Sequence, residues 1–140
     1  MQVEKRIVTF ASPEQVFRIY EDVQNWHTWD PDTKSATLDR PFVVGTRGKL
    51  APTKGRAVPI EVTAVERNKR FTVESRIPLF RMIFEHELES GGVATTVVHR
   101  ASFSGLLAPL LSRILVKQLE AGLPTTLASL KRKAEAQSAA

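Results

Sequence analysis

The sequence predicts an α+β domain in which a curved, seven-stranded antiparallel sheet wraps around one long C-terminal helix. Three observations carry this prediction. A first alternating segment, residues 2–10, precedes two short helical segments. Six further segments between residues 35 and 103 alternate apolar and polar side chains, as half-buried strands do. From Gly105 to about Gln137 the apolar residues recur every three or four positions, which is typical of an amphipathic helix.

The length of 140 residues fits one domain, which we place at residues 1–137. We expect residues 138–140 to form a frayed tail. Hydrophobic residues make up 42% and charged residues 25% of the chain, as in globular proteins. The longest apolar run, Leu106–Leu111, is too short to cross a bilayer, and charge at Glu4 interrupts any signal-peptide core. We therefore expect a cytoplasmic protein without an integral membrane segment. The sequence leaves the oligomeric state open.

Charge and residue types exclude several functions. The net charge is +5, but its tightest basic cluster, Lys131-Arg132-Lys133, falls in the last turns of the predicted helix, where cations complement the helix dipole. No nucleic-acid-binding motif accompanies it, so we expect no nucleic-acid partner. The chain has no cysteine, and its three histidines lack metal-ligand spacing. Because a phosphate-binding glycine loop is also absent, we expect no metal and no cofactor.

Two short helices are predicted after the first strand. Ser12 is a helix-capping residue, Pro13 suits the first helical position, and Gln15 stands where a capping-box side chain reaches back. A second short helix is expected over Val23–Trp29, and Pro31 ends it.

Turn residues separate the six later strands from one another. Gly45, Gly55, Asn68 and Gly91 mark the turns that are easiest to place. The clearest strand alternates charged side chains with Met82, Phe84, His86 and Leu88, which therefore share one face. We expect strands at residues 35–39, 47–51, 58–63, 70–77, 79–89 and 93–103.

The final helix carries one continuous apolar stripe, which we expect to face the concave side of the sheet. Pro124 cannot donate a hydrogen bond to the carbonyl four residues earlier, so a kink is expected near residues 120–122. The stripe consists of Leu107, Leu110, Leu111, Ile114, Leu115, Leu119, Leu123, Leu127 and Leu130.

The proportions of sheet and helix predict a cavity. Seven strands span about 30 Å, whereas a helix with its side chains is about 10 Å across. The sheet must curl around the helix, and such curling leaves apolar space in which small molecules bind. Small residues at the inward positions Ala36, Gly48 and Ala64 favour the same conclusion.

Several segments of the chain resemble segments that recur in one superfamily. They are the tryptophan-containing stretch 23–31, the strand and turn at 38–45, the hairpin and helix entry at 84–88, 99–100 and 103–105, and the Gly-Leu-Pro at 122–124 with the leucines after it. They are similar to the START-like, or SRPBCC, superfamily with the helix-grip fold, and within it to the polyketide cyclase/dehydrase-like group rather than the birch-pollen-allergen-like proteins. Because that superfamily contains enzymes, lipid carriers and hormone receptors, the resemblance implies the fold and a ligand cavity, and it leaves the reaction open.

His86 and Arg100 are the candidate catalytic residues. His86 is expected to face the cavity, where it could act as a general acid or base, and the alternative is a core histidine bonded to a carbonyl or water. His99 and Arg100 point to opposite faces of one strand, and the apolar residues on both faces leave their orientation open. Arg100 inside the cavity would bind a carboxylate or an enolate, and outside it would pair across strands with Glu85 or Glu87.

The ligand-binding prediction rests on aromatic and apolar side chains. The two tryptophans are expected at the cavity mouth, or else as a lid packed on the core, with Asp30 beside them exposed to solvent. Tyr20 is expected to donate to a ligand or to reach solvent. The predicted ligand-binding residues are Trp26, Trp29, Met82, Phe84, His86, Leu107, Leu111 and Leu115.

The sequence thus predicts a domain that binds a hydrophobic or aromatic small molecule, with transport or sequestration of that molecule as the expected role. Two alternatives stay open. One is an enzyme of the cyclase or dehydratase kind that uses the same cavity. The other is a protein–protein interaction module that uses the surface of Trp26 and Trp29 or an exposed edge strand.

Overall fold

The computed structural model describes residues 1–138 and contains one seven-stranded antiparallel sheet. Its strands follow the order β1-β7-β6-β5-β4-β3-β2. From β2 to β7 each strand therefore pairs with the next one along the chain, and β1 pairs with β7. The strands are β1 (Gln2–Thr9), β2 (Thr33–Leu38), β3 (Arg47–Pro52), β4 (Val58–Glu66), β5 (Arg70–Ile77), β6 (Phe80–Ser90) and β7 (Thr95–Ser104).

Three helices complete the described chain. The helix α1 (Pro13–Glu21) and the 3₁₀ helix η1 (Val23–Thr28) connect β1 to β2, and α2 (Ala108–Ser138) follows β7. Pro124 lies inside α2 without ending it. Of the predicted frayed tail, Ser138 is the last residue of α2, and 139–140 lie outside the described residues.

The predicted local signals form as expected. Ser12 Oγ accepts a hydrogen bond from the backbone N–H of Gln15 at 3.2 Å, and Gln15 Oε1 accepts one from the backbone N–H of Ser12 at 2.8 Å, which makes a capping box. Asn68 adopts a φ of 63° at the tip of the β4–β5 hairpin, a conformation that asparagine tolerates better than most residues. These local interactions fix where α1 begins and where β4 turns back.

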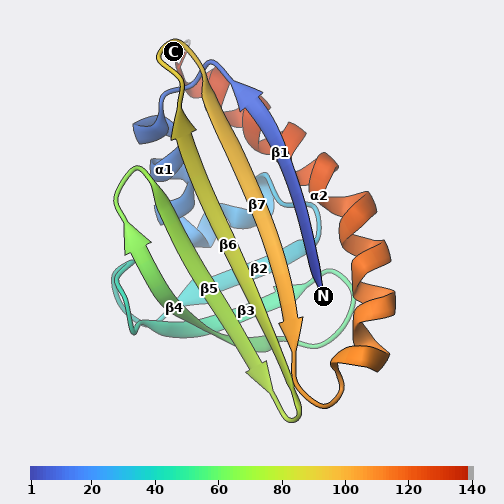
Figure 1. The fold of residues 1–140 in the computed structure, drawn as a ribbon. Coiled ribbons are helices and arrows are strands. Elements are labelled where there is room, and N and C mark those ends of the chain that lie inside the picture. Colours follow the sequence, from blue (N-terminus) through green and yellow to red (C-terminus); the bar gives the residue numbers. More distant parts are fainter. Residues whose placement is uncertain (139–140) are drawn as a thin grey trace.

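The sheet is strongly curled. Figure 1 shows β2 and β3 crossing behind β5, β6 and β7, with β4 curving round beside β5 to join the two parts, while α2 runs beside β1 along the opposite side of the molecule. The helices α1 and η1 lie behind the upper part of the sheet (Figure 1). This arrangement of a curled antiparallel sheet around one long helix confirms the predicted fold class.

The apolar interior divides into two clusters. The first joins α1, η1 and the C-terminal part of α2 to the upper sheet, with Phe17, Tyr20, Phe71, Leu127 and Leu130 among its most buried members. The second lies lower, where Phe80, Ala101 and Phe103 meet Leu107, just before α2, and Leu111, Leu115 and Leu119 of α2.

The predicted apolar stripe of α2 is only partly buried, which corrects the sequence analysis. Leu127 and Leu130 are each 1% exposed, whereas Leu110 is 69% and Ile114 is 59% exposed. The difference arises because the C-terminal part of α2 packs into the large first cluster, with α1 and η1 around it, whereas the N-terminal part packs against the smaller second cluster. A periodic pattern shows which residues share a helix face but not how wide the surface opposite that face is.

Candidate functional site

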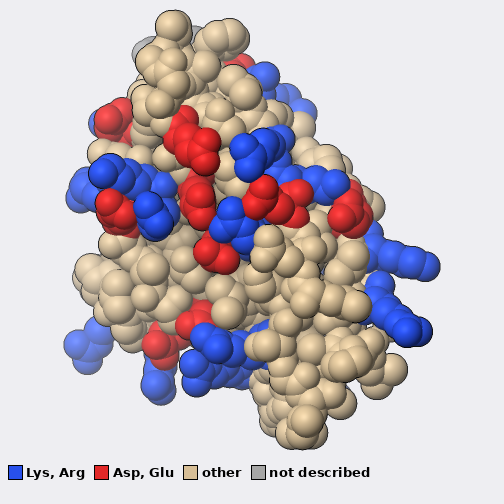
Figure 2. All heavy atoms as spheres, viewed as in Figure 1, with Lys and Arg blue, Asp and Glu red and all other residues tan. Residues whose placement is uncertain are grey.

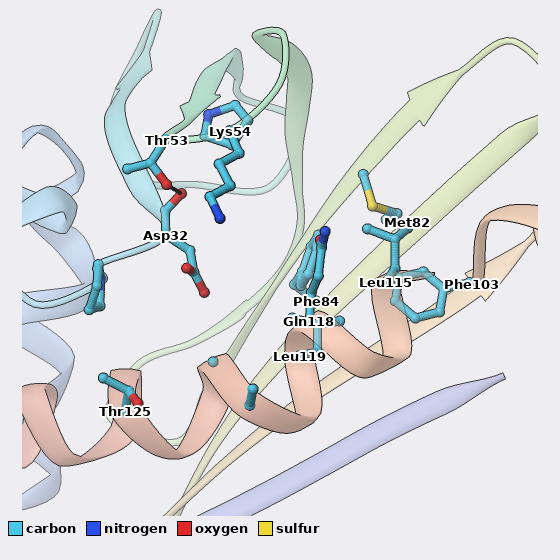
Figure 3. Close-up of a pocket in the computed structure, with 14 residues that line it drawn as sticks. Asp32, Thr53, Lys54, Met82, Phe84, Phe103, Leu115, Gln118, Leu119 and Thr125 are labelled. Carbon is cyan, nitrogen blue, oxygen red and sulfur yellow. Dashed lines mark hydrogen bonds between the residues drawn. The ribbon is translucent and has the colours of Figure 1, made fainter. Parts of the chain in front are cut away.

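A cavity lies where the two apolar clusters meet, between the sheet and α2. Its inner part, here called the inner cavity, has a volume of about 280 Å³ and apolar walls from Ile60, Val73, Met82, Phe84, Leu115 and Leu119. An adjoining outer cavity of about 400 Å³ shares the last four of these residues. Figure 3 shows the outer cavity between Asp32, Thr53 and Lys54 on one side and Leu115, Gln118, Leu119 and Thr125 of α2 on the other.

The alternation of β6 places three predicted residues in the cavity wall. Met82, Phe84 and His86 stand two residues apart and all line the inner cavity, as expected for one face of a strand. The 3₁₀ helix η1 and the residue after it add Trp26 and Trp29 to the same wall. The helix α2 closes the opposite side with Leu115, which was also predicted.

Two predicted lining residues lie elsewhere. Leu107 and Leu111 are absent from both cavity walls and instead pack against the second apolar cluster beside Phe80 and Phe103. Leu111 stands one turn before Leu115 on α2, and Leu107 is the residue just before α2 begins, so both lie at the lower end of the sheet. The cavity therefore begins at Leu115, about two turns later along the chain than the predicted first lining residue, Leu107.

The small residues predicted to leave space are not its source. Ala36, Gly48 and Ala64 line neither cavity. A Cβ atom at Gly48 would stand 1.9 Å from the carbonyl oxygen of Thr37, so this glycine permits close approach of β2 and β3. The space lies instead between β6 and α2, where the two apolar clusters meet.

An aromatic cluster with polar edges closes the inner end of the cavity. The Tyr20 hydroxyl and His99 Nε2 are hydrogen-bonded at 2.8 Å in the buried interior. His86 stacks on Phe71 with ring centroids 4.0 Å apart, and its ring meets that of His99 at 4.6 Å. Tyr20 thus neither reaches solvent nor points freely at a ligand, because His99 takes its hydroxyl.

Burial keeps these groups uncharged. Burial lowers the pKa of His86 to about 3. Burial, and then the neighbouring His86, lowers the pKa of His99 well below its usual range, and burial raises the pKa of Tyr20. At neutral pH the inner end of the cavity therefore presents two neutral imidazoles, one of which is bonded to the neutral phenol behind it.

Asp30 is half-buried and lines the inner cavity, which corrects its predicted exposure. Its Oδ2 accepts from the Thr33 hydroxyl at 2.8 Å, and its Oδ1 accepts from the Thr126 hydroxyl at 3.3 Å and from the backbone N–H of Asp32 at 3.1 Å. Burial raises the pKa of this carboxyl, and the hydroxyl of Thr33 opposes that shift. Asp30 therefore joins the η1–β2 connection to α2 at the edge of the cavity.

The guanidinium of Arg100 is held on the outer face of the sheet. Its nitrogens lie 2.7 Å from Glu4, 2.9 Å from Glu87 and 3.4 Å from Glu85. Figure 2 shows acidic and basic side chains intermixed over this face of the sheet. Of the two orientations that the sequence left open, the structure therefore shows His99 inside and Arg100 outside, paired across strands with the predicted glutamates.

The surface predicted for a protein partner is not exposed. Trp26 is 6% and Trp29 is 3% exposed, because both indoles pack between η1 and the core. Trp26 Nε1 also donates to the backbone carbonyl of Tyr20 at 2.9 Å. The pair forms part of the cavity wall and cannot offer a contact face to another protein.

Sequence reasoning missed the Tyr20–His99 pair and the role of Asp30. On β7 the adjacent residues Val97 and Val98 are both buried, which hides the alternation that would have oriented His99. The polar residues Arg100 and Ser102 do alternate with His99 and Ala101, and this weaker signal gives the correct orientation. For Asp30 no pattern in the sequence indicates the contact with α2.

Within residues 1–138 no three His, Asp or Glu side chains gather as ligands of one metal ion. None of the helices in this range is long and apolar enough to span a bilayer.

Solved structures share this fold. TTHA0849 from Thermus thermophilus is similar with a TM-score of 0.78 and 20% identity over 99% of each chain. A START superfamily protein from Mycobacterium smegmatis is similar with a TM-score of 0.70 and 17% identity over 97% of this chain and 98% of that one. The di-domain ARO/CYC BexL from the BE-7585A biosynthetic pathway is similar with a TM-score of 0.77 and 17% identity over 96% of this chain and 46% of that one. Identities this low show a shared fold alone.

Among curated proteins none matches the sequence. The sequence does match the family described as "Polyketide cyclase / dehydrase and lipid transport" over residues 1–135. This match covers nearly the whole sheet and α2, and the START superfamily neighbour has the same fold. The chain therefore belongs to the polyketide cyclase/dehydrase and lipid transport family, as the resemblance to the START-like group implied.

Proposed function

We propose that this protein binds a largely apolar or aromatic small molecule in the inner cavity and carries or sequesters it without converting it. The observation that supports this most is the inner cavity itself, about 280 Å³ of space with apolar walls from both the sheet and α2. Such cavities are where proteins take up small ligands. The outer cavity adjoins it and offers a route of entry past Lys54 and Thr125.

Burial supplies the affinity in this proposal. Removing about 200 Å² of ligand apolar surface from water contributes on the order of 5 kcal/mol at about 25 cal/mol per Å². The loss of ligand motion on binding offsets part of that gain. The preformed walls reduce this cost, since Phe84, Leu115 and Leu119 already pack in the second cluster.

Filling the cavity tests the proposal. Leu119 lines both cavities and Leu110 is exposed on the same helix. We expect Leu119→Trp to weaken naphthalene binding at least about tenfold by calorimetry, because the indole occupies the space, and Leu110→Trp to leave it unchanged. Native mass spectrometry of the purified protein would identify a ligand acquired in the cell. Equal affinities in the two variants, or no apolar ligand bound by the wild-type protein, would contradict the proposal.

An enzyme of the cyclase or dehydratase kind is the second candidate. The convergence of His86, His99 and Tyr20 beside the cavity favours it, because such groups move protons. The pKa of about 3 for His86 counts against it, since so weak a base removes few protons at neutral pH. A bound polyketone recovered unchanged supports the carrier. Conversion that His86→Gln abolishes without loss of affinity would establish the enzyme.

A further inference from the structure

The inner end of the cavity contains two buried polar atoms without partners. Trp29 Nε1 makes no hydrogen bond within the described part of the chain. His86 Nδ1 has no partner of hydrogen-bonding geometry there either, although the backbone of Phe71 and of Phe84 lies near enough to this imidazole to oppose the lowering of its pKa by burial. Both residues line the inner cavity. A buried donor that lacks a partner costs free energy, so two such atoms beside one cavity are unusual for a purely structural wall.

The neighbouring tryptophan shows the contrast. Trp26 lines the same cavity, yet its Nε1 donates to the backbone carbonyl of Tyr20 at 2.9 Å. The two indoles are three residues apart on one short segment, and their ring centroids are 6.4 Å apart. The local fold therefore satisfies one indole N–H and leaves the other for a group that enters from the cavity.

Trp29 and His86 belong to one ring cluster. Each contacts Tyr20, at 5.9 Å and 5.5 Å between ring centroids, and each contacts His99, at 6.2 Å and 4.6 Å. The hydrogen bond between the two central residues occupies the Tyr20 hydroxyl and His99 Nε2, whereas Trp29 Nε1 and His86 Nδ1 have no such partner. The unpaired atoms thus lie on either side of a satisfied pair at the same end of the cavity.

We propose that this end of the cavity recognises the neutral hydroxyl or keto oxygen of an otherwise apolar ligand, with Trp29 Nε1 as the donor to that oxygen and His86 as a second polar contact. This inference rests on the proposed function and adds the ligand's chemical class. An imidazole donates or accepts according to its tautomer, so His86 suits either oxygen.

The charges around the site select a neutral ligand. Both imidazoles are uncharged because burial lowers their pKa values, and Arg100 is engaged by glutamates on the other face. Asp30, a carboxyl group, lines the same inner cavity. The remaining cation of this cavity, Lys54, lines both cavities and so stands where they adjoin, away from the ring cluster. A carboxylate entering the inner end would lose its hydration without gaining an adjacent cation, whereas a neutral oxygen needs only the N–H.

Three probes with one ring system test the proposal on the full chain. Naphthalene measures apolar binding, 2-naphthol adds a hydroxyl, and 2-naphthoate adds a negative charge. We expect Trp29→Phe to reduce the affinity ratio of 2-naphthol to naphthalene by about tenfold, as the loss of one buried hydrogen bond does. Trp26→Phe should leave that ratio unchanged, because its N–H is already engaged. In the wild-type protein 2-naphthoate should bind at least about tenfold more weakly than 2-naphthol.

Nuclear magnetic resonance provides a test without any substitution. The chain has two tryptophans, so a ¹⁵N-labelled sample gives two indole N–H signals. We expect 2-naphthol to shift the Trp29 indole proton downfield, as a new hydrogen bond does, and naphthalene to cause no such shift. The Trp26 signal serves as the internal reference.

The outcomes separate the two proposals. Equal Trp29 shifts with both probes, or an affinity ratio unaffected by Trp29→Phe, would overturn the polar recognition while the apolar cavity stands. Tighter binding of 2-naphthoate than of 2-naphthol would overturn the preference for a neutral oxygen. Failure of every probe to bind the wild-type protein would overturn the proposed function and this inference with it.

Discussion

The two halves of α2 carry the same apolar pattern but have different roles. The anchor half, residues 123–138, buries Leu127, Leu130 and Ala134 in the first apolar cluster. The wall half, residues 108–122, leaves Leu110 exposed and its inward leucines half-buried beside the cavity. One helix thus fixes the fold at one end and forms a ligand wall at the other.

Polar contacts follow the same division. The anchor half is tied by Thr126 to Asp30, and by Glu135, whose Oε2 accepts from the Thr9 hydroxyl at 2.8 Å. The wall half has an ion pair between Glu120 and Lys5 at 2.6 Å, with both side chains open to solvent over a third or more of their surface. Part-buried hydrogen bonds hold one half in place, whereas exposed ion pairs add little. The comparison predicts that substitutions of similar size will differ in effect between the halves.

The largest expected effect is the loss of an anchor leucine. Leu130→Ala removes a side chain that is 1% exposed and should lower the free energy of unfolding by about 2–5 kcal/mol through lost burial and a new cavity. Leu110→Ala, in the wall half, should change it by less than about 0.5 kcal/mol. Urea denaturation followed by circular dichroism measures both. Equal losses would show that the two halves are equally packed and would end the distinction.

The second largest effect is the pH dependence of the free energy of unfolding that arises from His86 and His99, the buried histidines at the inner end of the cavity. Folding lowers the pKa of His99 and His86 from 6.5, so the unfolded chain binds more protons than the folded one below that pH. Stability is therefore full above pH 6.5 and falls below it, by about 1.4 kcal/mol per pH unit for each such histidine.

Single substitutions identify the residue responsible for this loss. His86→Phe should preserve the ring stack on Phe71 and make the decline between about pH 6.5 and 5 shallower by about 1.4 kcal/mol per unit. His27→Ala, at an exposed position, serves as the control and should leave the slope unchanged. Unfolding measured in urea at several pH values gives the slopes. An unaltered slope in His86→Phe would mean that this imidazole is not held neutral by burial.

The sequence predicted best where neighbouring residues determine the outcome. The capping box of Ser12 and Gln15 needs only a spacing of three, and the inward face of Met82, Phe84 and His86 needs only the alternation of one strand. These parts of the fold and of the cavity wall follow from interactions within a few residues. No distant segment has to be placed first.

The sequence failed where distant segments decide. Leu110 and Leu130 occupy the same stripe, and only the position of α1 and β1 relative to α2 makes one exposed and the other buried. Asp30 is half-buried where it meets α2, and its partner there, Thr126, is 96 residues away in the sequence. Gly48 was interpreted as spare volume because the contact that requires it, with the Thr37 carbonyl of the adjacent strand, depends on strand register.

The smallest expected effect concerns that Asp30–Thr126 contact, which tests whether the anchor half depends on polar bonds as well as apolar burial. Thr126→Val keeps the shape of the side chain but removes the hydroxyl that donates to Asp30 Oδ1 at 3.3 Å. We expect the free energy of unfolding to fall by only about 1 kcal/mol, because Asp30 keeps its hydrogen bonds from the Thr33 hydroxyl and from the backbone N–H of Asp32.

The pKa of Asp30 provides a second readout of the same substitution. The Thr126 hydroxyl favours the ionised carboxyl, so its loss should raise that pKa further, which a carboxyl titration by nuclear magnetic resonance would detect. The adjacent Thr125 is exposed at the outer cavity, and Thr125→Val should alter neither quantity. Equal losses of unfolding free energy in the two variants would show that the Thr126 hydroxyl contributes no stability through its bond to Asp30. A loss confined to Thr126→Val, together with the raised pKa, would show that a hydrogen bond positions α2 where its anchor half begins.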